Sequence, residues 1–167
     1  LKNRFGYDCS DAVHYGDLVY FPNYKKETGI PYWARCAMLD PFIVHFDSIG
    51  DGAGELKKIQ RSWAPYSFTS FRRAALIQEK LPYVNLKAKT FPAKIPSGET
   101  GLYTLIDDHT MVASAATNTT VPAGRIEFIE DHENPPSRAY LKIQESLSLA
   151  SYYFDVEIPG KGSRCFE

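Results

Sequence analysis

Gly16-Asp17-Leu18-Val19-Tyr20-Phe21 opens the stretch that decides the fold of this chain, and the stretch runs on to Pro65. Three more short runs lie within it: Gly-Ile-Pro-Tyr-Trp-Ala-Arg at 29–35, Ile-Val-His-Phe-Asp-Ser at 43–48, and Ser-Trp-Ala-Pro at 62–65. Each run is rich in β-branched and aromatic residues and is bounded by Gly, Pro, Asp or Asn. This pattern predicts a small, strongly bent antiparallel sheet or barrel.

The spacing of these runs resembles that of PWWP domains, a family of Tudor-like chromatin readers. A typical PWWP domain carries G-D-L-V-W, then G-Y-P-W-W-P, then V-x-F-F-D, and finally a lone Trp before a helix. The corresponding residues here are Gly16–Tyr20, Gly29–Ala34, Val44–Asp47 and Trp63. The resemblance covers about a third of the chain. It implies an α+β fold, with a small five-stranded PWWP-like barrel followed by helices. The β-rich insertion predicted after the barrel has no counterpart in the PWWP pattern.

Outward from this stretch, composition shifts divide the chain into four parts. They are expected to be an N-terminal extension with the barrel and a first helix (1–81), a β-rich insertion (82–133), a closing helix packed on the barrel (134–158), and a linker (159–167).

Local patterns predict individual elements within these parts. Apolar spacing and capping residues favour helices at Phe68–Leu81 and Ser137–Phe154, with Ser70 or Ser137 as caps. Strands are predicted at Asp17–Phe21, Tyr32–Leu39, Phe42–Asp47, Gly101–Ile106 and Met111–Ala116. The glycine-rich segment 48–54 is predicted to be a flexible loop.

Composition suits one domain of ordinary size, or a small domain with a large insertion. The chain has 167 residues, of which 44% are hydrophobic and 23% charged, and its net charge is -1. No apolar run approaches the length needed to cross a bilayer, and no signal-peptide pattern is present. Because the first residue is not Met, we expect a piece of a longer protein. The three cysteines have no C-x-x-C spacing and are expected to be free thiols in a reducing compartment.

The resemblance implies a site for methylated lysine. In PWWP domains the methylated ammonium lies among three aromatic side chains, whose ring faces attract the cation. The three positions correspond to Ile30, Trp33 and His45, of which Trp33 supplies a good wall. Tyr24 and Tyr32 are candidates to replace the missing ring. The alternative is that Trp33 packs in a core or a domain interface and the cage is vestigial.

Three other aromatic residues, Tyr20, Phe46 and Trp63, are predicted to belong to the core.

The front of the chain leans basic, which suggests contacts with DNA phosphates. Between residues 16 and 75 there are eight basic and six acidic residues, whereas from residue 76 onward there are nine basic and twelve acidic ones. PWWP domains contact DNA through a basic surface beside the cage, without sequence preference. The candidates here are Lys25, Lys26, Arg35, Lys57, Lys58 and Arg61. The alternative is a solvated charged face.

Catalytic patterns are weak. Asp107-Asp108-His109 places two carboxylates beside an imidazole, a combination that serves acid–base chemistry or metal binding. The same tripeptide also predicts a hairpin turn between Ile106 and Met111, because neighbouring strand residues point to opposite faces. Cys9 and His14 lack a second pair of zinc ligands. No catalytic residue, metal or cofactor is therefore predicted.

The sequence thus predicts a nuclear, non-enzymatic, chromatin-associated module. It is expected to bind a histone tail through a methylated lysine, with weak, non-specific contacts to the DNA backbone, and to associate with other chromatin proteins rather than with a membrane. The alternative is a protein–protein interaction module of a nuclear complex, in which the aromatic cage is vestigial.

Overall fold

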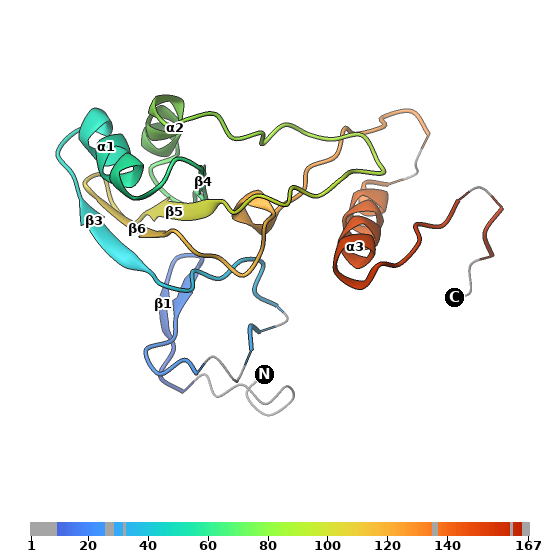
Figure 1. The fold of residues 1–167 in the computed structure, drawn as a ribbon, viewed down its shortest axis with the longest axis horizontal. Coiled ribbons are helices and arrows are strands. Elements are labelled where there is room, and N and C mark those ends of the chain that lie inside the picture. Colours follow the sequence, from blue (N-terminus) through green and yellow to red (C-terminus); the bar gives the residue numbers. More distant parts are fainter. Residues whose placement is uncertain (1–9, 26–28, 32, 135–136, 161, 165–167) are drawn as a thin grey trace.

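The computed structural model describes residues 10–25, 29–31, 33–134, 137–160 and 162–164, and its fold is α+β (Figure 1). In chain order the elements are β1 (Val13–Tyr15), β2 (Leu18–Tyr20), β3 (Phe42–His45), α1 (Ile49–Ile59), β4 (Trp63–Pro65), α2 (Phe71–Lys80), β5 (Gly101–Leu105), β6 (Thr110–Ser114), a 3₁₀ turn η2 (Pro122–Gly124) and α3 (Ala139–Phe154).

The described strands form two sheets rather than a closed barrel. β1 and β2 pair as a hairpin, while the second sheet has the order β3-β6-β5-β4, with only the β4–β5 pair parallel. Segment 82–133, expected to be an insertion, therefore supplies the two central strands of the larger sheet. Strand β5 takes a central position because all of its residues are buried, and a strand buried on both faces needs neighbouring elements on both sides. The strands predicted at Gly101–Ile106 and Met111–Ala116 are confirmed.

The main core lies between the larger sheet and the helices α1 and α2, which cover one of its faces (Figure 1). Strand register brings Tyr103 opposite Ala113 and Leu105 opposite Met111, so these four side chains share the helix-covered face. Helix residues Leu56 and Ile77 close over them and are fully buried. The helix predicted at Phe68–Leu81 is confirmed as α2, although it starts three residues later.

Helix α1 corrects the prediction of a glycine-rich loop at 48–54. Ser48 caps its first turn, because the Ser48 hydroxyl accepts a hydrogen bond from the Asp51 amide at 3.2 Å. Asp51 in turn accepts one from the Asp47 amide at 3.1 Å. A Cβ at Gly52 would lie 3.0 Å from the Phe46 ring. Glycine thus lowers helix propensity here but allows the helix to approach the sheet closely.

Trp63 is the buried side chain that joins four elements, and its predicted place in the core is confirmed. Its indole N–H donates to the carbonyl oxygens of Leu56 at 3.0 Å and Gln60 at 2.9 Å, at the end of α1. Its own carbonyl accepts a hydrogen bond from Gln78 of α2 at 3.1 Å. Its backbone pairs with Gly101 of β5. The carbonyl groups at the end of α1 are therefore satisfied inside the core.

Two predictions for the front of the chain are wrong. The strand expected at Tyr32–Leu39 is reduced, among its described residues, to one isolated bridge between Met38 and Thr117. Tyr20, expected in the core, is 57% exposed, whereas Phe46 is buried as predicted. The hairpin is joined to the end of β5 by Tyr15, whose hydroxyl donates to the Ile106 carbonyl at 2.8 Å.

Helix α3 packs on a second, smaller core rather than on a barrel. Its residues Leu141 and Leu149 contact the buried side chains Val121, Ile126 and Phe128. Figure 1 shows α3 at the opposite end of the molecule from α1, beside the long connection between α2 and β5. No helix in the described part of the chain is both long enough and apolar enough to span a membrane.

Replacing Gly101 with Ala is expected to lower the free energy of unfolding by about 1–3 kcal/mol, because an added Cβ would lie 2.6 Å from the Trp63 ring. Gly54→Ala, in α1, is the matched control: nothing lies within 4 Å of its Cβ position. That control is expected to raise the free energy of unfolding by about 0.5–1 kcal/mol. Urea denaturation measures both, and equal effects would contradict the packing of Trp63 on Gly101.

Candidate functional site

A pocket with a volume of about 230 Å³ lies beside η2. Three chain segments line it: 65–67 at the end of β4, 85–96 on the long connection between α2 and β5, and 121–127 around η2. Arg35 completes the lining. Figure 1 shows how the long connection leaves α2, extends toward α3 and returns to β5.

Positive charge dominates the polar lining of this pocket, which we call the cationic pocket. Its charged residues are Arg35, Lys87, Lys89, Lys94 and Arg125, against one carboxylate, Glu127. Arg125 pairs with Glu127 at 3.1 Å, and Arg35 pairs with Glu145 of α3 at 2.9 Å. Among the described residues no ion pair is found for the three lysines. The lysines therefore carry the net positive charge of the pocket.

Arg35 is held in place from two sides. Its guanidinium donates to the Gly124 carbonyl at 3.4 Å as well as to Glu145. Gly124 has φ +65°, and a Cβ there would lie 2.4 Å from the Arg35 carbonyl oxygen. A side chain at position 124 would thus be both strained and obstructed, so glycine permits this close approach.

Lys89 is fixed through its backbone. Its amide donates to the Glu127 carbonyl at 2.8 Å, and its carbonyl accepts from the Ile129 amide at 2.9 Å. These two bonds form a parallel bridge between Lys89 and Phe128, a residue of the second core. The bridge joins two of the three pocket walls, so the pocket geometry depends on the second core.

Tyr66 provides the aromatic ring of the cationic pocket. Its amide donates to the Tyr103 carbonyl at 2.9 Å, which ties this wall to β5. Its hydroxyl donates to Asp17 at 2.9 Å. Burial raises the pKa of Tyr66, and Asp17 raises it further, whereas the positive charges of Arg35 and Arg125 lower it. The positive charges of both guanidinium groups thus favour the ionised form of the Tyr66 hydroxyl.

The rest of the lining is largely apolar. Side chains with no hydrogen-bonding group form part of every wall, and they are Pro65, Leu86, Ile95, Pro96, Val121, Pro122, Ala123 and Ile126. The pocket can therefore hold a ligand that combines an anionic group with an apolar part.

The residues predicted for the methyl-lysine cage are only partly brought together. Trp33 is 42% exposed, and its ring lies 6.2 Å from the ring of Phe21. Tyr24, 43% exposed, lies on the same turn, since its amide donates to the Phe21 carbonyl at 3.3 Å. We call Phe21, Tyr24 and Trp33 the hairpin aromatic cluster. Phe21 was not anticipated as a site residue, although its position beside a Pro-Asn turn was visible in the sequence.

His45 stands apart from this cluster in its contacts. His45 ends β3, and its ring contacts the hydroxyl of Thr110 on β6 at 3.3 Å. Ile30 is half-buried. No ring contact joins His45 to Trp33 or Tyr24, all three of which are described. Tyr32 lies outside the described residues.

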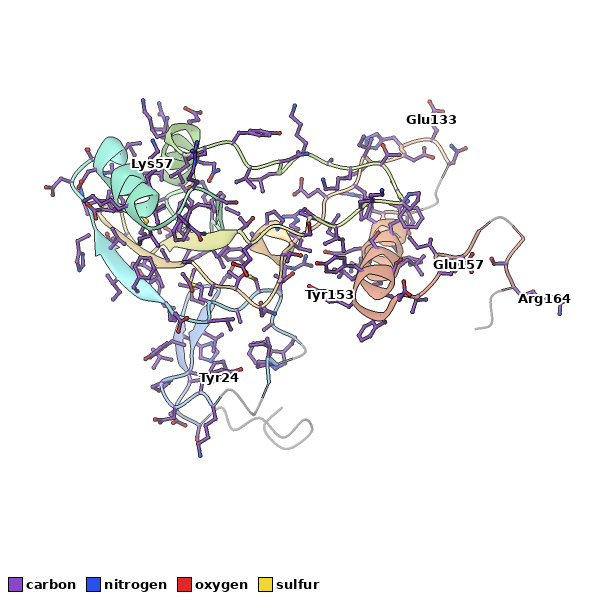
Figure 2. All side chains as sticks on the ribbon, viewed as in Figure 1. Tyr24, Lys57, Glu133, Tyr153, Glu157 and Arg164 are labelled. Atoms are coloured by element: carbon purple, nitrogen blue, oxygen red, sulfur yellow. The ribbon has the colours of Figure 1, made fainter. Side chains whose placement is uncertain are left out.

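The residues predicted to contact DNA phosphates are spread over three places. Lys57, Lys58 and Arg61 lie exposed at the end of α1, where Lys58 pairs with Glu55. Figure 2 shows Lys57 on α1 and Tyr24, the neighbour of exposed Lys25, at the opposite side of the molecule. Arg35 belongs to the cationic pocket, and Lys26 lies outside the described residues.

The Asp107-Asp108-His109 tripeptide forms the predicted hairpin turn between β5 and β6. The Asp107 carboxylate accepts a hydrogen bond from the His109 amide at 2.8 Å, and this bond lowers the pKa of Asp107. Asp108 accepts from the Ser70 hydroxyl at 2.7 Å, so that Ser70 does not cap α2. No group of three or more metal-ligating side chains is found in the part of the chain that the structure describes.

Three lysines of the cationic pocket were missed from the sequence, although a signal was present. Val84, Leu86 and Ala88 alternate, so positions 87 and 89, both Lys, share the other face of an extended segment. Nothing local shows that Arg35 and Arg125 lie beside them, because the pocket is assembled by long-range contacts such as that of Arg35 with Gly124, 89 positions further along the chain.

Comparison with known proteins gives no match to any protein-family model, curated protein or solved structure. The fold and the pocket describe the protein as an α+β domain with a cationic pocket.

Burial raises the pKa of the Cys36 thiol to about 11, against the opposing hydrogen bonds of Thr117 and Ala37. Because the thiolate is the reactive form, Cys36 is expected to react with iodoacetamide at pH 8 at least about tenfold more slowly than free cysteine. Peptide mapping by mass spectrometry measures the rate at this residue. Unfolding in urea is the control and should restore the rate of an ordinary thiol. Equal rates in folded and unfolded protein would contradict the burial of this thiol.

Proposed function

We propose that this chain is a chromatin-associated binding module, without enzymatic activity, that binds a methylated histone lysine at the hairpin aromatic cluster. The observation that carries the proposal is the exposed Trp33 ring beside the ring of Phe21, with exposed Tyr24 on the turn that follows Phe21. A trimethylammonium group cannot donate hydrogen bonds, and aromatic faces attract it at about 0.5–2 kcal/mol each. Trp is the best of the aromatic residues for this contact.

The position of Trp33 suits a binding residue. Pro31, two residues before Trp33, is buried, and the Ala34 amide donates to the Pro31 carbonyl at 2.8 Å, which closes a turn that includes the tryptophan. A buried proline in the same turn fixes the backbone and leaves the exposed indole available to a ligand, at a small further loss of conformational entropy on binding.

The relationship to PWWP domains belongs to the same proposal. Its support is the chain order, in which the Gly16-Asp17 turn and strand β2 are followed by Trp33, then by β3, and then by the strand that carries Trp63. The nucleus is the expected location, and nucleosomal histone tails and DNA are the expected partners.

DNA contact would be auxiliary. Exposed Lys25 adjoins the hairpin aromatic cluster, and a single cation here would add a weak contact to backbone phosphates that declines as salt rises. Lys57, Lys58 and Arg61 lie elsewhere, so they would engage a second stretch of DNA rather than extend the same surface.

The test is a titration with a trimethyl-lysine histone peptide, followed by backbone NMR shifts and tryptophan fluorescence. Trp33→Ala is expected to weaken peptide binding about tenfold or more, because the best cage wall is lost. Phe154→Ala is the matched control, since Phe154 is an exposed aromatic residue on α3.

Three outcomes of this titration contradict the proposal. They are no response to the peptide, equal affinity for the unmodified peptide, and equal effects of the two variants.

A protein–protein interaction module is the second candidate. It is favoured by the exposed apolar side chains of α3, where Ile143 is 61% and Phe154 78% exposed. If the methylated peptide gives no shifts, this candidate takes precedence. In that case Ile143→Ser together with Phe154→Ser should abolish binding to the partner protein.

A further inference from the structure

We propose that the cationic pocket is a nucleotide-binding site, in which Lys87, Lys89 and Lys94 hold the phosphate and the apolar wall holds the base. This site involves none of the hairpin aromatic cluster. Nucleotide binding at this pocket therefore does not depend on methyl-lysine recognition.

The charge distribution indicates an anion. Both arginines of the pocket already have a carboxylate partner, Glu145 for Arg35 and Glu127 for Arg125. The three lysines come from one connection, 87–94, and have no ion-pair partner among the described residues. Lysine ammonium groups act as point charges for phosphate. A dianionic phosphate would neutralise this excess charge.

The walls indicate that the anion carries an organic group. Ile95, Pro96 and Ile126 line the same pocket as the lysines, and the ring of Tyr66 lies among the lining residues. A base is planar, largely apolar on its faces, and stacks on aromatic rings whatever its identity. Inorganic phosphate alone would leave this apolar wall unused.

The size favours a single nucleotide over a duplex. A volume of about 230 Å³ lies just below the usual range for small-molecule pockets, which starts at about 300 Å³. A DNA duplex meets proteins along an extended surface of phosphates, whereas these lysines face a pocket. A free nucleotide and the phosphorylated end of a single strand present the same phosphate and base, so the pocket suits both.

Isothermal titration calorimetry with ADP tests the proposal, with adenosine and inorganic phosphate as component probes. ADP is expected to bind at least tenfold more tightly than either component. A 5′-phosphorylated single strand of eight nucleotides distinguishes the two sources: tighter binding than ADP indicates a strand end, and weaker binding a free nucleotide. Both variants described next are first checked for folding by circular dichroism.

Lys89→Gln together with Lys94→Gln is expected to weaken ADP binding at least tenfold. The matched control is Lys57→Gln together with Lys80→Gln, which removes two exposed lysines of α1 and α2 outside the pocket and should change affinity less than twofold.

The proposal is overturned if ADP does not bind, if inorganic phosphate binds as tightly as ADP, if a duplex binds more tightly than all other probes, or if both double variants weaken binding equally. The methyl-lysine proposal is tested separately, since Trp33→Ala should leave ADP affinity unchanged and the pocket variant should leave peptide affinity unchanged.

Discussion

The buried indole of Trp63 is the contact on which the larger sheet and its two helices depend. A helix end inside a core must find partners for its last carbonyl groups, or it loses stability. Here the indole N–H supplies the partner for α1, and the Trp63 carbonyl receives a side chain of α2. The same residue opens the strand that pairs with β5, beside a glycine that leaves room for the ring.

The two possible binding surfaces depend on different parts of the fold. The hairpin aromatic cluster lies on a small element whose turn is tied to the sheet through Tyr15 and Ile106. The cationic pocket instead requires the second core, since Phe128 and Lys89 hold its walls in register. A hydrogen bond links the two surfaces, from the Tyr66 hydroxyl of the pocket to Asp17 of the hairpin. Trp33, Lys89 and Lys94 take no part in that bond, so substitutions of these residues test the proposals for a methylated lysine and for a nucleotide separately.

Local sequence signals succeeded where a short segment alone determines its structure. The strands around the Asp107-Asp108-His109 turn and the helix that contains Ala74 and Ile77 were predicted correctly. Segment 48–54 was predicted incorrectly as a loop. Glycine has a low helix propensity, but the Ser48 cap, the hydrogen bond of Asp51 and the packing of Gly52 against Phe46 stabilise a helix there. The barrel prediction failed to anticipate that β5 and β6 would occupy the centre of the sheet.

By itself, the sequence determined the α+β class and the core positions of Phe46 and Trp63, since hydrophobicity and spacing act over a few residues. Only the tertiary structure decided that Arg35, Lys89 and Arg125 share one pocket and that Trp33 lies beside Phe21 while His45 contacts Thr110. These contacts join residues far apart in the chain, and they form only when packing of the two cores has set the path of the backbone between them.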